Sequence, residues 1–314
     1  MLSAVNLYFN DLVRSIDAAW TRFWFTPGGM WHLALLRRLV GLLALVWLAS
    51  FSFELTALFG QHGLLPLESI HQVMTSGDPT ASVPGFSHLY LIQSDMGLWV
   101  SHGICLFILL LLMLDVFPLA TTPLGLWVVL SYVHRGPVLT GLFEPVLCML
   151  LLYLSVVPGK RLVDLRRGQH RATWVANLAA RLIQVHLCGF YLLIGLSKLG
   201  AVVWWTGDAT WLLMTDSQHR LMDMTPLAFH RFVGQGITHA WVFFDLVFPL
   251  LIWIRKARPL LIGISIVVWV WAGLVTGCVG FSMLMIVSNL AFVPSEVIEG
   301  WFRDRQQSDT EPNT

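Results

Sequence analysis

Apolar segments of membrane-spanning length are the feature that most limits how this chain folds. A helix of about 20 apolar residues crosses the ~30 Å hydrocarbon core of a bilayer. Segments of this length, or close to it, occur at 31–53, 96–116, 119–134, 139–157, 177–199, 238–254, 259–276 and 279–294. Because 56% of the residues are hydrophobic and 12% charged, the sequence predicts an all-α protein, a polytopic membrane helical bundle of about eight spans. Segments 119–134 and 259–294 leave the exact count open.

The basic residues predict the orientation of the spans, because Lys and Arg in short loops stay on the cytoplasmic side. With both termini placed in the cytoplasm, fifteen Lys and Arg residues lie at the inner face and three lie outside, with Lys198 in or at the outer end of a span. The three outer residues are Arg135, Arg220 and Arg231. Residues 54–95 contain no Lys or Arg, which also favours an outer location. The sequence therefore predicts a multi-pass integral membrane protein, which lies in the cytoplasmic membrane if the cell is bacterial.

Three parts follow from this map. We expect residues 1–30 to form an amphipathic helix on the inner membrane surface, followed by a turn. Residues 31–295 form the transmembrane domain, with outer segments 54–95 and 200–237 that we expect to contain short helices over the outer mouth. Residues 296–314 are a polar cytoplasmic tail.

Several classes of partner are disfavoured. The net charge of +1 gives no reason to expect nucleic acid. The four cysteines have no CxxC spacing and the histidines have no HxxxH or HExxH spacing, so we predict no metal site. Membrane lipids are the partners that the composition itself implies.

A polar stripe marks the segment from Trp174 to Trp205. Its members are spaced by 4, 3, 4, 3, 4 and 3 residues, which is one face of a helix: Asn177, Arg181, Gln184, Cys188, Tyr191, Gly195 and Lys198. An ionisable group within a span is costly, faces the bundle interior or a wet cavity, and is by default a functional-site hypothesis. We expect Arg181 and Gln184 to link helices near the cytoplasm, which leaves the outer end of the stripe as the candidate site.

The outer end of this segment carries a resemblance to a known family. Tyr191, Gly195, Lys198-Leu199, Trp205 and Gly207 resemble the HTTM (horizontally transferred transmembrane) domain, the membrane core of vitamin K-dependent gamma-glutamyl carboxylase. Weaker support comes from further positions over residues 20–295: Arg37 or Arg38, Phe59-Gly60, Gly63 to Pro66, Arg135-Gly136-Pro137, Val157 to Gly159 and Asp245.

The resemblance implies that Lys198 is a catalytic base that deprotonates reduced vitamin K, or menaquinol, at the outer face. A lysine acts as a base only when its amine is neutral, and desolvation favours that form. Two departures argue against carrying over protein carboxylation. No large lumenal domain follows the core, and Val267 to Trp271 stand where the family has a late histidine.

Other residues complete the candidate site. We assign Tyr191, Gly195, Trp205, Gly207, Asp208 and His134 to substrate or cofactor binding, and Glu144 and Asp245 to a proton relay. A structural alternative stays open for several of them. For Lys198, the alternative is that its side chain reaches the outer headgroups or pairs with Asp208. Gly195 serves close helix packing, and Tyr191 satisfies its hydroxyl inside the bundle.

The remaining buried charges also have alternatives. For Glu144, the alternative is a hydrogen bond to Arg135 or His134, and for Asp245 it is a hydrogen bond to His239. Arg37 and Arg38 extend to the inner headgroups, or one of them turns into the bundle.

Two functions from different classes follow. The first is a lysine-base enzyme that acts on a lipid-soluble quinol or related compound, with an unknown protein or peptide substrate as a further partner. The second is a non-catalytic membrane module that binds a lipid, quinone or partner protein in the same pocket. A transporter is disfavoured because no pair of broken helices is repeated.

Overall fold

The chain folds into helices throughout the part that the structure describes. This computed structural model describes residues 2–68, 85–157, 159, 165, 172–216 and 220–308. The only pairing of extended backbone within these ranges is an antiparallel bridge between Gly28 and Thr173. The all-α prediction is therefore confirmed.

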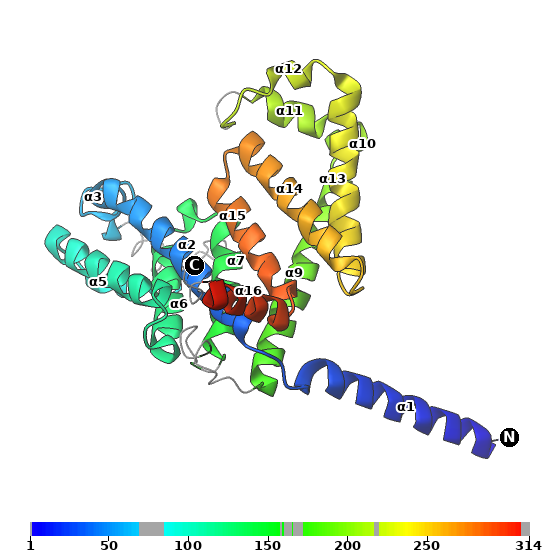
Figure 1. Cartoon of the computed structure of the whole chain (residues 1–314). Helices are drawn as coiled ribbons and strands as arrows, with labels where there is room; N and C mark the ends of the chain where they lie inside the picture. Colours follow the sequence, from blue (N-terminus) through cyan, green and yellow to red (C-terminus); the bar gives the residue numbers. More distant parts are fainter. Residues whose placement is uncertain are drawn as a thin grey trace, which may run out of the picture.

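Each expected span overlaps a helix, and the bounds are similar for most of them. These helices are α2 (Trp31–Ser50), α5 (Asp95–Met113), α6 (Pro118–Arg135), α7 (Phe143–Ser155), α9 (Trp174–Leu199), α13 (Arg231–Leu251), α14 (Arg258–Thr276) and α15 (Val279–Ser288) (Figure 1). Helix α13 is the exception, because it begins at Arg231 rather than at residue 238. Short 3₁₀ segments continue α2 at Phe51–Phe53 and α15 at Asn289–Phe292. A helix satisfies its backbone polar groups within its own segment, so a long apolar segment forms a helix whatever its neighbours are. The apolar pattern of the sequence was therefore enough to locate these helices.

Fewer than eight of these helices have both the length and the apolarity that are typical of a membrane span. Within the described residues, Trp31–Phe53, α5, α9 and α14 are long and apolar enough. A bent pair, Val279–Phe292 with Ser295–Phe302, makes a fifth if it counts as one span. Helix α7 is apolar but has only 13 residues. The structure thus supports a multi-span helical membrane protein with four to five candidate spans.

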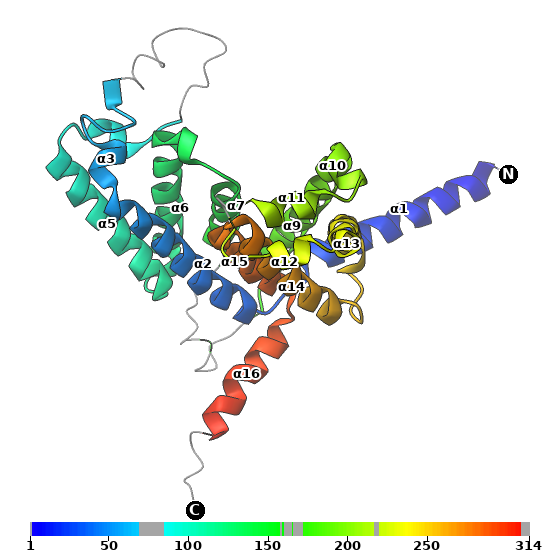
Figure 2. The ribbon, with the colours of Figure 1, turned by 90° about the horizontal axis from the view of Figure 1, so that it is seen from above.

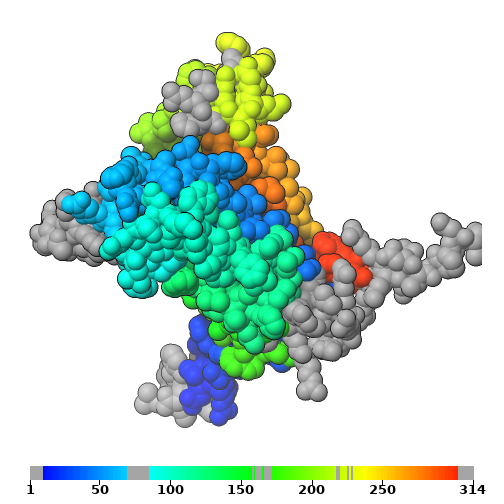
Figure 3. Space-filling model, turned by 90° about the vertical axis from the view of Figure 1, so that its left-hand side faces the viewer, coloured from blue at the N-terminus to red at the C-terminus, as the bar shows by residue number. Residues whose placement is uncertain are grey.

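The two outer segments contain short helices, as expected. The first has α3 (Leu55–Phe59) and the 3₁₀ turn His88–Leu91, while residues 69–84 lie outside the described part. The second has α10 (Val202–Trp205), α11 (Ala209–Thr215) and α12 (Thr225–Ala228). Figure 3 shows α11 and α12 at one end of the molecule, beyond the face that α2, α5 and α6 form.

The first and last helices project away from the bundle. Helix α1 (Leu2–Phe25) and helix α16 (Ser295–Ser308) extend from its body in different directions (Figure 2). The base of α1 is fixed by Asn177, whose Nδ2 donates to the carbonyl oxygens of Phe23 and Trp24 at 2.9 Å each. The segment expected as a polar tail thus begins as a helix.

Helix α2 lies at the centre of the packing. It contacts α5, α6, α7, α15 and α16. Its fully buried residues recur at helical spacing: Leu33, Leu36, Val40, Ala44 and Leu48. The approach to α5 is closest at Gly41, where an added Cβ would stand 2.9 Å from the backbone nitrogen of Met113. A glycine there lets the two backbones touch.

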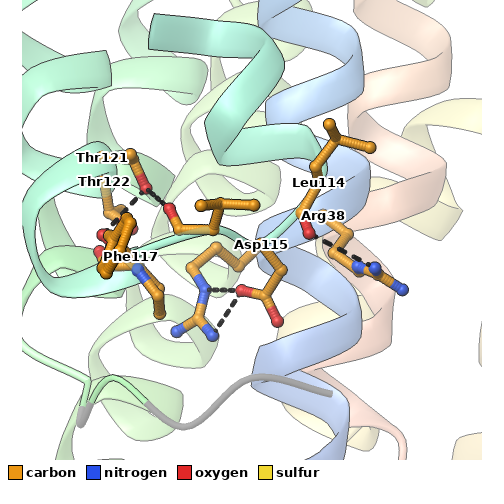
Figure 4. Close-up of polar contacts among 9 residues, drawn as sticks. Arg38, Leu114, Asp115, Phe117, Thr121 and Thr122 are labelled. Atoms are coloured by element: carbon orange, nitrogen blue, oxygen red, sulfur yellow. Dashed lines mark hydrogen bonds and ion pairs between the residues drawn. The ribbon is translucent and has the colours of Figure 1, made fainter. Parts of the chain in front are cut away.

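A buried ion pair joins the start of α2 to the turn between α5 and α6. Arg37 Nε donates to Asp115 Oδ1 at 2.8 Å, Nη2 lies 2.7 Å from the same oxygen, and both side chains are almost fully buried (Figure 4). Arg38 instead donates to the carbonyl oxygen of Leu114 at 3.5 Å. Of the two alternatives for these arginines, the structure confirms that one of them, Arg37, turns into the bundle, where Asp115 neutralises its charge.

The turn that carries Asp115 has an unusual backbone. Asp115 has φ 60° and Phe117 has φ 47°, a left-handed region that side-chain-bearing residues seldom adopt. Thr121 Oγ1 donates to the carbonyl oxygens of Val116 and Phe117, at 3.0 and 3.2 Å. The ion pair therefore lies on a turn whose tight conformation is held by local hydrogen bonds as well.

Breaking this pair from one side tests its structural role. We expect Arg37→Met or Asp115→Asn to destabilise the protein by about 3 kcal/mol, because each leaves one buried group without its ionic partner. The double variant Arg37→Met/Asp115→Leu should recover much of that loss. The measurement is the thermal unfolding midpoint of the purified protein in detergent. Additive losses in the double variant would show that the two side chains act independently.

Candidate functional site

A second buried ion pair joins α9 to α13. Lys198 Nζ donates to Asp245 Oδ2 at 2.6 Å, and the side chains are 10% and 1% exposed. Both residues lie on helix faces that meet along the α9–α13 contact. Two structural alternatives are therefore wrong: Lys198 pairs with Asp245 rather than Asp208, and Asp245 bonds Lys198 rather than His239.

Two tryptophans cover the ammonium group of Lys198. Its Nζ lies 4.0 Å from the ring centroid of Trp241 and 4.5 Å from that of Trp204. The two indoles meet edge to face, with centroids 5.8 Å apart. A cation over indole faces is stabilised by their quadrupoles. The pair thus lies in an aromatic enclosure instead of in open water.

One oxygen of this ion pair has no hydrogen-bond partner. Asp245 is fully buried, yet its Oδ1 accepts no hydrogen bond from the described residues. The indole nitrogen of Trp241, one helix turn away, is also buried without a partner. A buried carboxylate oxygen normally accepts hydrogen bonds, so an unused one is a position where a ligand hydroxyl could donate.

Tyr191 lies two turns below Lys198 on the same face of α9. Its hydroxyl accepts from Trp269 Nε1 at 2.6 Å and shares a hydrogen bond with Ser265 Oγ at 2.9 Å. Asn289 Nδ2 donates to the same Ser265 oxygen at 2.8 Å. The Tyr191 ring also packs on Phe248, with centroids 4.2 Å apart. The hydroxyl is satisfied within the bundle, which agrees with the structural alternative for this residue.

Gly195 allows α9 and α13 to approach. An added Cβ would stand 2.9 Å from Leu246 Cδ2 and 3.2 Å from Asp245 Cβ. The space beside this glycine is therefore filled by α13 side chains. This close contact brings Asp245 within reach of Lys198, one turn further along α9.

The turn after α9 holds Trp205, Gly207 and Asp208 above the pair. Trp205 Nε1 donates to the carbonyl oxygen of Leu199 at 2.6 Å, but the indole remains 64% exposed. Gly207 has φ +83°, and its carbonyl accepts from Thr238 Oγ1 at 2.9 Å. Asp208 precedes α11, and its backbone N–H donates to Val203. These residues shape the cover of the site, and none of their described contacts reaches Lys198 Nζ.

His134 and Glu144 contact other parts of the bundle. His134 Nδ1 donates to the carbonyl oxygen of Phe86 at 2.9 Å. Glu144 accepts from Trp47 Nε1 at 2.9 Å and from the backbone N–H of Gly141 at 2.8 Å. The expected bond from Glu144 to Arg135 or His134 is wrong, because Glu144 ties the start of α7 to α2 instead.

A tyrosine links the first outer segment to the residue next to Arg135. Tyr90 Oη donates to the carbonyl oxygen of His134 at 2.7 Å. Burial raises the pKa of the Tyr90 phenol, an effect that the nearby Arg135 charge opposes. The phenol is the donor in this bond, because a carbonyl oxygen only accepts.

The inner half of the polar stripe joins helices, as expected. Arg181 Nη1 donates to Gln184 Oε1 at 3.0 Å, and Gln184 Nε2 donates to the carbonyl oxygen of Ala291 at 2.6 Å. The Arg181 guanidinium also lies over the rings of Phe23 and Trp253. These contacts leave the outer end of α9 as the candidate site.

Sequence reasoning had named Asp245 but had not connected it, or the aromatic residues beside it on α13, with Lys198. Trp241, Asp245 and Phe248 are spaced by 4 and 3 residues, which places all three on the face of α13 that meets α9. That spacing could have identified them. Ser265, Trp269 and Asn289 come from α14 and the end of α15, and no pattern within α9 points to them. Among the described residues, no three His, Cys, Asp or Glu side chains form a group that could hold a metal ion.

The fold and site define a helical membrane-type bundle with a lysine–aspartate pair buried between two of its helices. Comparison with known proteins adds no closer assignment: no protein family, curated protein or solved structure matches the chain. The likeness to HTTM domains therefore rests on the residues quoted from the sequence.

Two glycines of α9 test the close helix contact. We expect Gly195→Ala to destabilise the protein by about 1–3 kcal/mol, because its Cβ overlaps Leu246 and Asp245. Gly189→Ala is the matched control on the same helix, since nothing lies within 4 Å of an added Cβ there. It should be neutral or slightly stabilising because alanine favours helix. Thermal unfolding in detergent measures both, and equal midpoints would contradict the contact.

Proposed function

We propose that this protein is a multi-pass membrane enzyme that removes a proton from a lipid-soluble quinol or a related hydroxyl compound. Lys198 is the base and Asp245 is its partner. The observation that carries the proposal is the buried Lys198–Asp245 pair, enclosed by two tryptophans and with one carboxylate oxygen unused. The resemblance of the Lys198 region to the HTTM domain is part of the same proposal.

A comparison of the two buried ion pairs supports a chemical role for this one. The guanidinium of arginine does not act as a base in proteins, so the contact between Arg37 and Asp115 has a structural role. Lysine gives up its proton far more readily when it is removed from water. The Lys198–Asp245 pair therefore contains a cation that can lose its proton, whereas the Arg37–Asp115 pair does not.

The proton transfer needs only groups that the site contains. When the Lys198 ammonium passes a proton to Asp245 Oδ2, across their 2.6 Å hydrogen bond, a neutral amine faces a neutral acid. The amine then takes the proton of the substrate hydroxyl. The O–H bond breaks, an N–H bond forms, and the electron pair stays on the substrate oxygen, which the new ammonium stabilises.

The aromatic enclosure fits a flat substrate ring. Indole faces stack on aromatic rings with offset or edge contacts. Trp204 and Trp241 already lie against the Lys198 amine, so a ring held by either would bring its hydroxyl to the pair. Asp245 Oδ1 is the acceptor that would orient this hydroxyl before the proton moves.

We further propose that the helices cross the membrane eight times, with both termini in the cytoplasm. The distribution of Lys and Arg supports this orientation, and each expected span corresponds to a described helix. In this arrangement the Lys198–Asp245 pair lies near the outer face, below the segment of α10 to α12.

Quinol turnover tests the function. The purified protein is supplied with reduced vitamin K or menaquinol and oxygen, and epoxide formation and oxygen uptake are measured. One quinol and one O₂ give one epoxide and one water. We expect Lys198→Met to lower the rate about 100-fold or more, because a positioned base contributes at least that factor.

The variant Lys198→Arg separates loss of the base from loss of the fold. Arginine keeps the positive charge beside Asp245 but does not act as a base, so this protein should unfold near the wild-type temperature and be inactive. Turnover by Lys198→Arg at the wild-type rate would refute the base. If wild type and Lys198→Arg bind quinol equally and neither forms epoxide, the protein is the non-catalytic binding module.

A native cysteine tests the orientation. Cys278 is exposed in the turn between α14 and α15, while Cys105 and Cys188 are buried and Cys148 is partly buried within α7. We expect a membrane-impermeant maleimide added from outside intact cells to modify the protein once, at Cys278. Cys278→Ser should abolish that labelling. Labelling only after the membrane is opened would place this turn in the cytoplasm and overturn the orientation.

A further inference from the structure

A cavity at the outer end of the bundle contains a buried arginine. The cavity measures about 410 Å³ and lies between α3, the start of α5 and the end of α6. Its lining includes Arg135, Asp95 and Glu68 together with the apolar side chains of Phe59 and Leu98. It is separate from the Lys198–Asp245 pair, and nothing in the proposed function uses it.

Arg135 is held by the backbone of the first outer segment. Its Nη2 donates to the carbonyl oxygen of Leu65 at 2.6 Å and to that of Phe59 at 3.4 Å. The guanidinium carbon lies 5.7 Å from the ring centroid of Phe59. These contacts fix the position of the guanidinium, but two carbonyl groups do not cancel its charge.

The other end of the guanidinium is unused. Arg135 is 2% exposed, and its Nη1 is buried without a hydrogen-bond partner among the described residues. Within the described part of the chain, no carboxylate forms an ion pair with it. A buried cation without a carboxylate is costly, and a planar guanidinium with free N–H groups matches the oxygens of a phosphate or carboxylate. Arg135 is therefore suited to an anionic group.

The rim of the same cavity has the opposite charge. Glu68 and Asp95 are exposed residues that line it. Asp95 Oδ1 accepts from the backbone N–H of Gln61 at 3.3 Å, and the described structure records no partner for the Glu68 carboxylate. Two carboxylates beside a buried arginine would repel a simple anion. They would attract an ammonium group attached to that anion.

We propose that this cavity binds a small zwitterion, with its anionic group on Arg135 and its primary ammonium group on Glu68 and Asp95. Phosphoethanolamine is the chemistry that fits, either as the headgroup of a phospholipid or as a free solute. A primary ammonium donates hydrogen bonds to the carboxylates, whereas the trimethylammonium of choline does not. The cavity should therefore prefer ethanolamine over choline.

The test uses the full-length protein in nanodiscs. One arm compares discs of phosphatidylcholine with discs that also contain phosphatidylethanolamine, and reads the thermal unfolding midpoint. The other arm titrates free phosphoethanolamine, phosphocholine and inorganic phosphate into phosphatidylcholine discs. Stabilisation in the first arm identifies a lipid headgroup, and saturable binding only in the second identifies a free solute. Either result supports the zwitterion site.

Single substitutions test separately the residue proposed to bind the ammonium group and the residue proposed to bind the anionic group. Glu68→Gln should weaken phosphoethanolamine binding about threefold, the size of an exposed ion pair. It should not weaken phosphate binding, and should slightly strengthen it, because one of the two repelling carboxylates is removed. Glu54→Gln is the matched control, because Glu54 is an exposed carboxylate outside the cavity lining. Arg135→Gln should weaken binding of phosphoethanolamine and phosphate about thirtyfold through loss of charged hydrogen bonds. If that variant does not fold, Glu68→Gln carries the test.

Two results would overturn the proposal. One is that neither phosphatidylethanolamine nor free phosphoethanolamine changes the unfolding midpoint. The other is that choline and ethanolamine compounds bind equally in both wild type and Glu68→Gln. Because the quinol assay depends on Lys198 and this test on Arg135 and Glu68, failure of one leaves the other unaffected.

Discussion

Neutralising positive charge inside an apolar bundle is the constraint on which the rest of the structure depends. The Arg37–Asp115 pair joins α2 to the turn between α5 and α6, and the Lys198–Asp245 pair joins α9 to α13. An unpaired ion in such a place costs several kcal/mol. Each pair therefore fixes how one helix lies against another, and apolar contacts such as that of Gly195 with Leu246 complete the fit.

The buried cations differ in the groups that contact them. These differences distinguish the residues that we regard as structural from those to which we assign a function. Arg181 lies over aromatic rings and bonds Gln184, which leaves it a link between helices. Arg37 has a carboxylate partner, and a guanidinium does not act as a base in proteins. Lys198 also has a carboxylate, but its amine can exchange a proton. Within the described part of the chain, Arg135 has only backbone carbonyls and one ring face as partners, which is the basis of the ligand site proposed there.

The polar stripe of α9 shows how far sequence reasoning reaches. Its spacing predicted that Gln184, Tyr191 and Lys198 share one face that turns into the bundle, and all three are buried there. The partners were predicted wrongly. The structural alternative for Asp245 paired it with His239, yet its partner is Lys198, 47 residues away. Spacing within one helix contains no information about which face of another helix it meets.

The sequence by itself determined the helices and their polar faces, because helix length, apolar content and the 3.6-residue repeat are local properties. The tertiary structure alone decided that Arg37 turns inward, that two tryptophans enclose Lys198, and that Arg135 keeps an unused N–H group. Each of these outcomes depends on contacts between distant segments. The energy of a buried charge is set by the groups that surround it, and only the packed bundle brings those groups together.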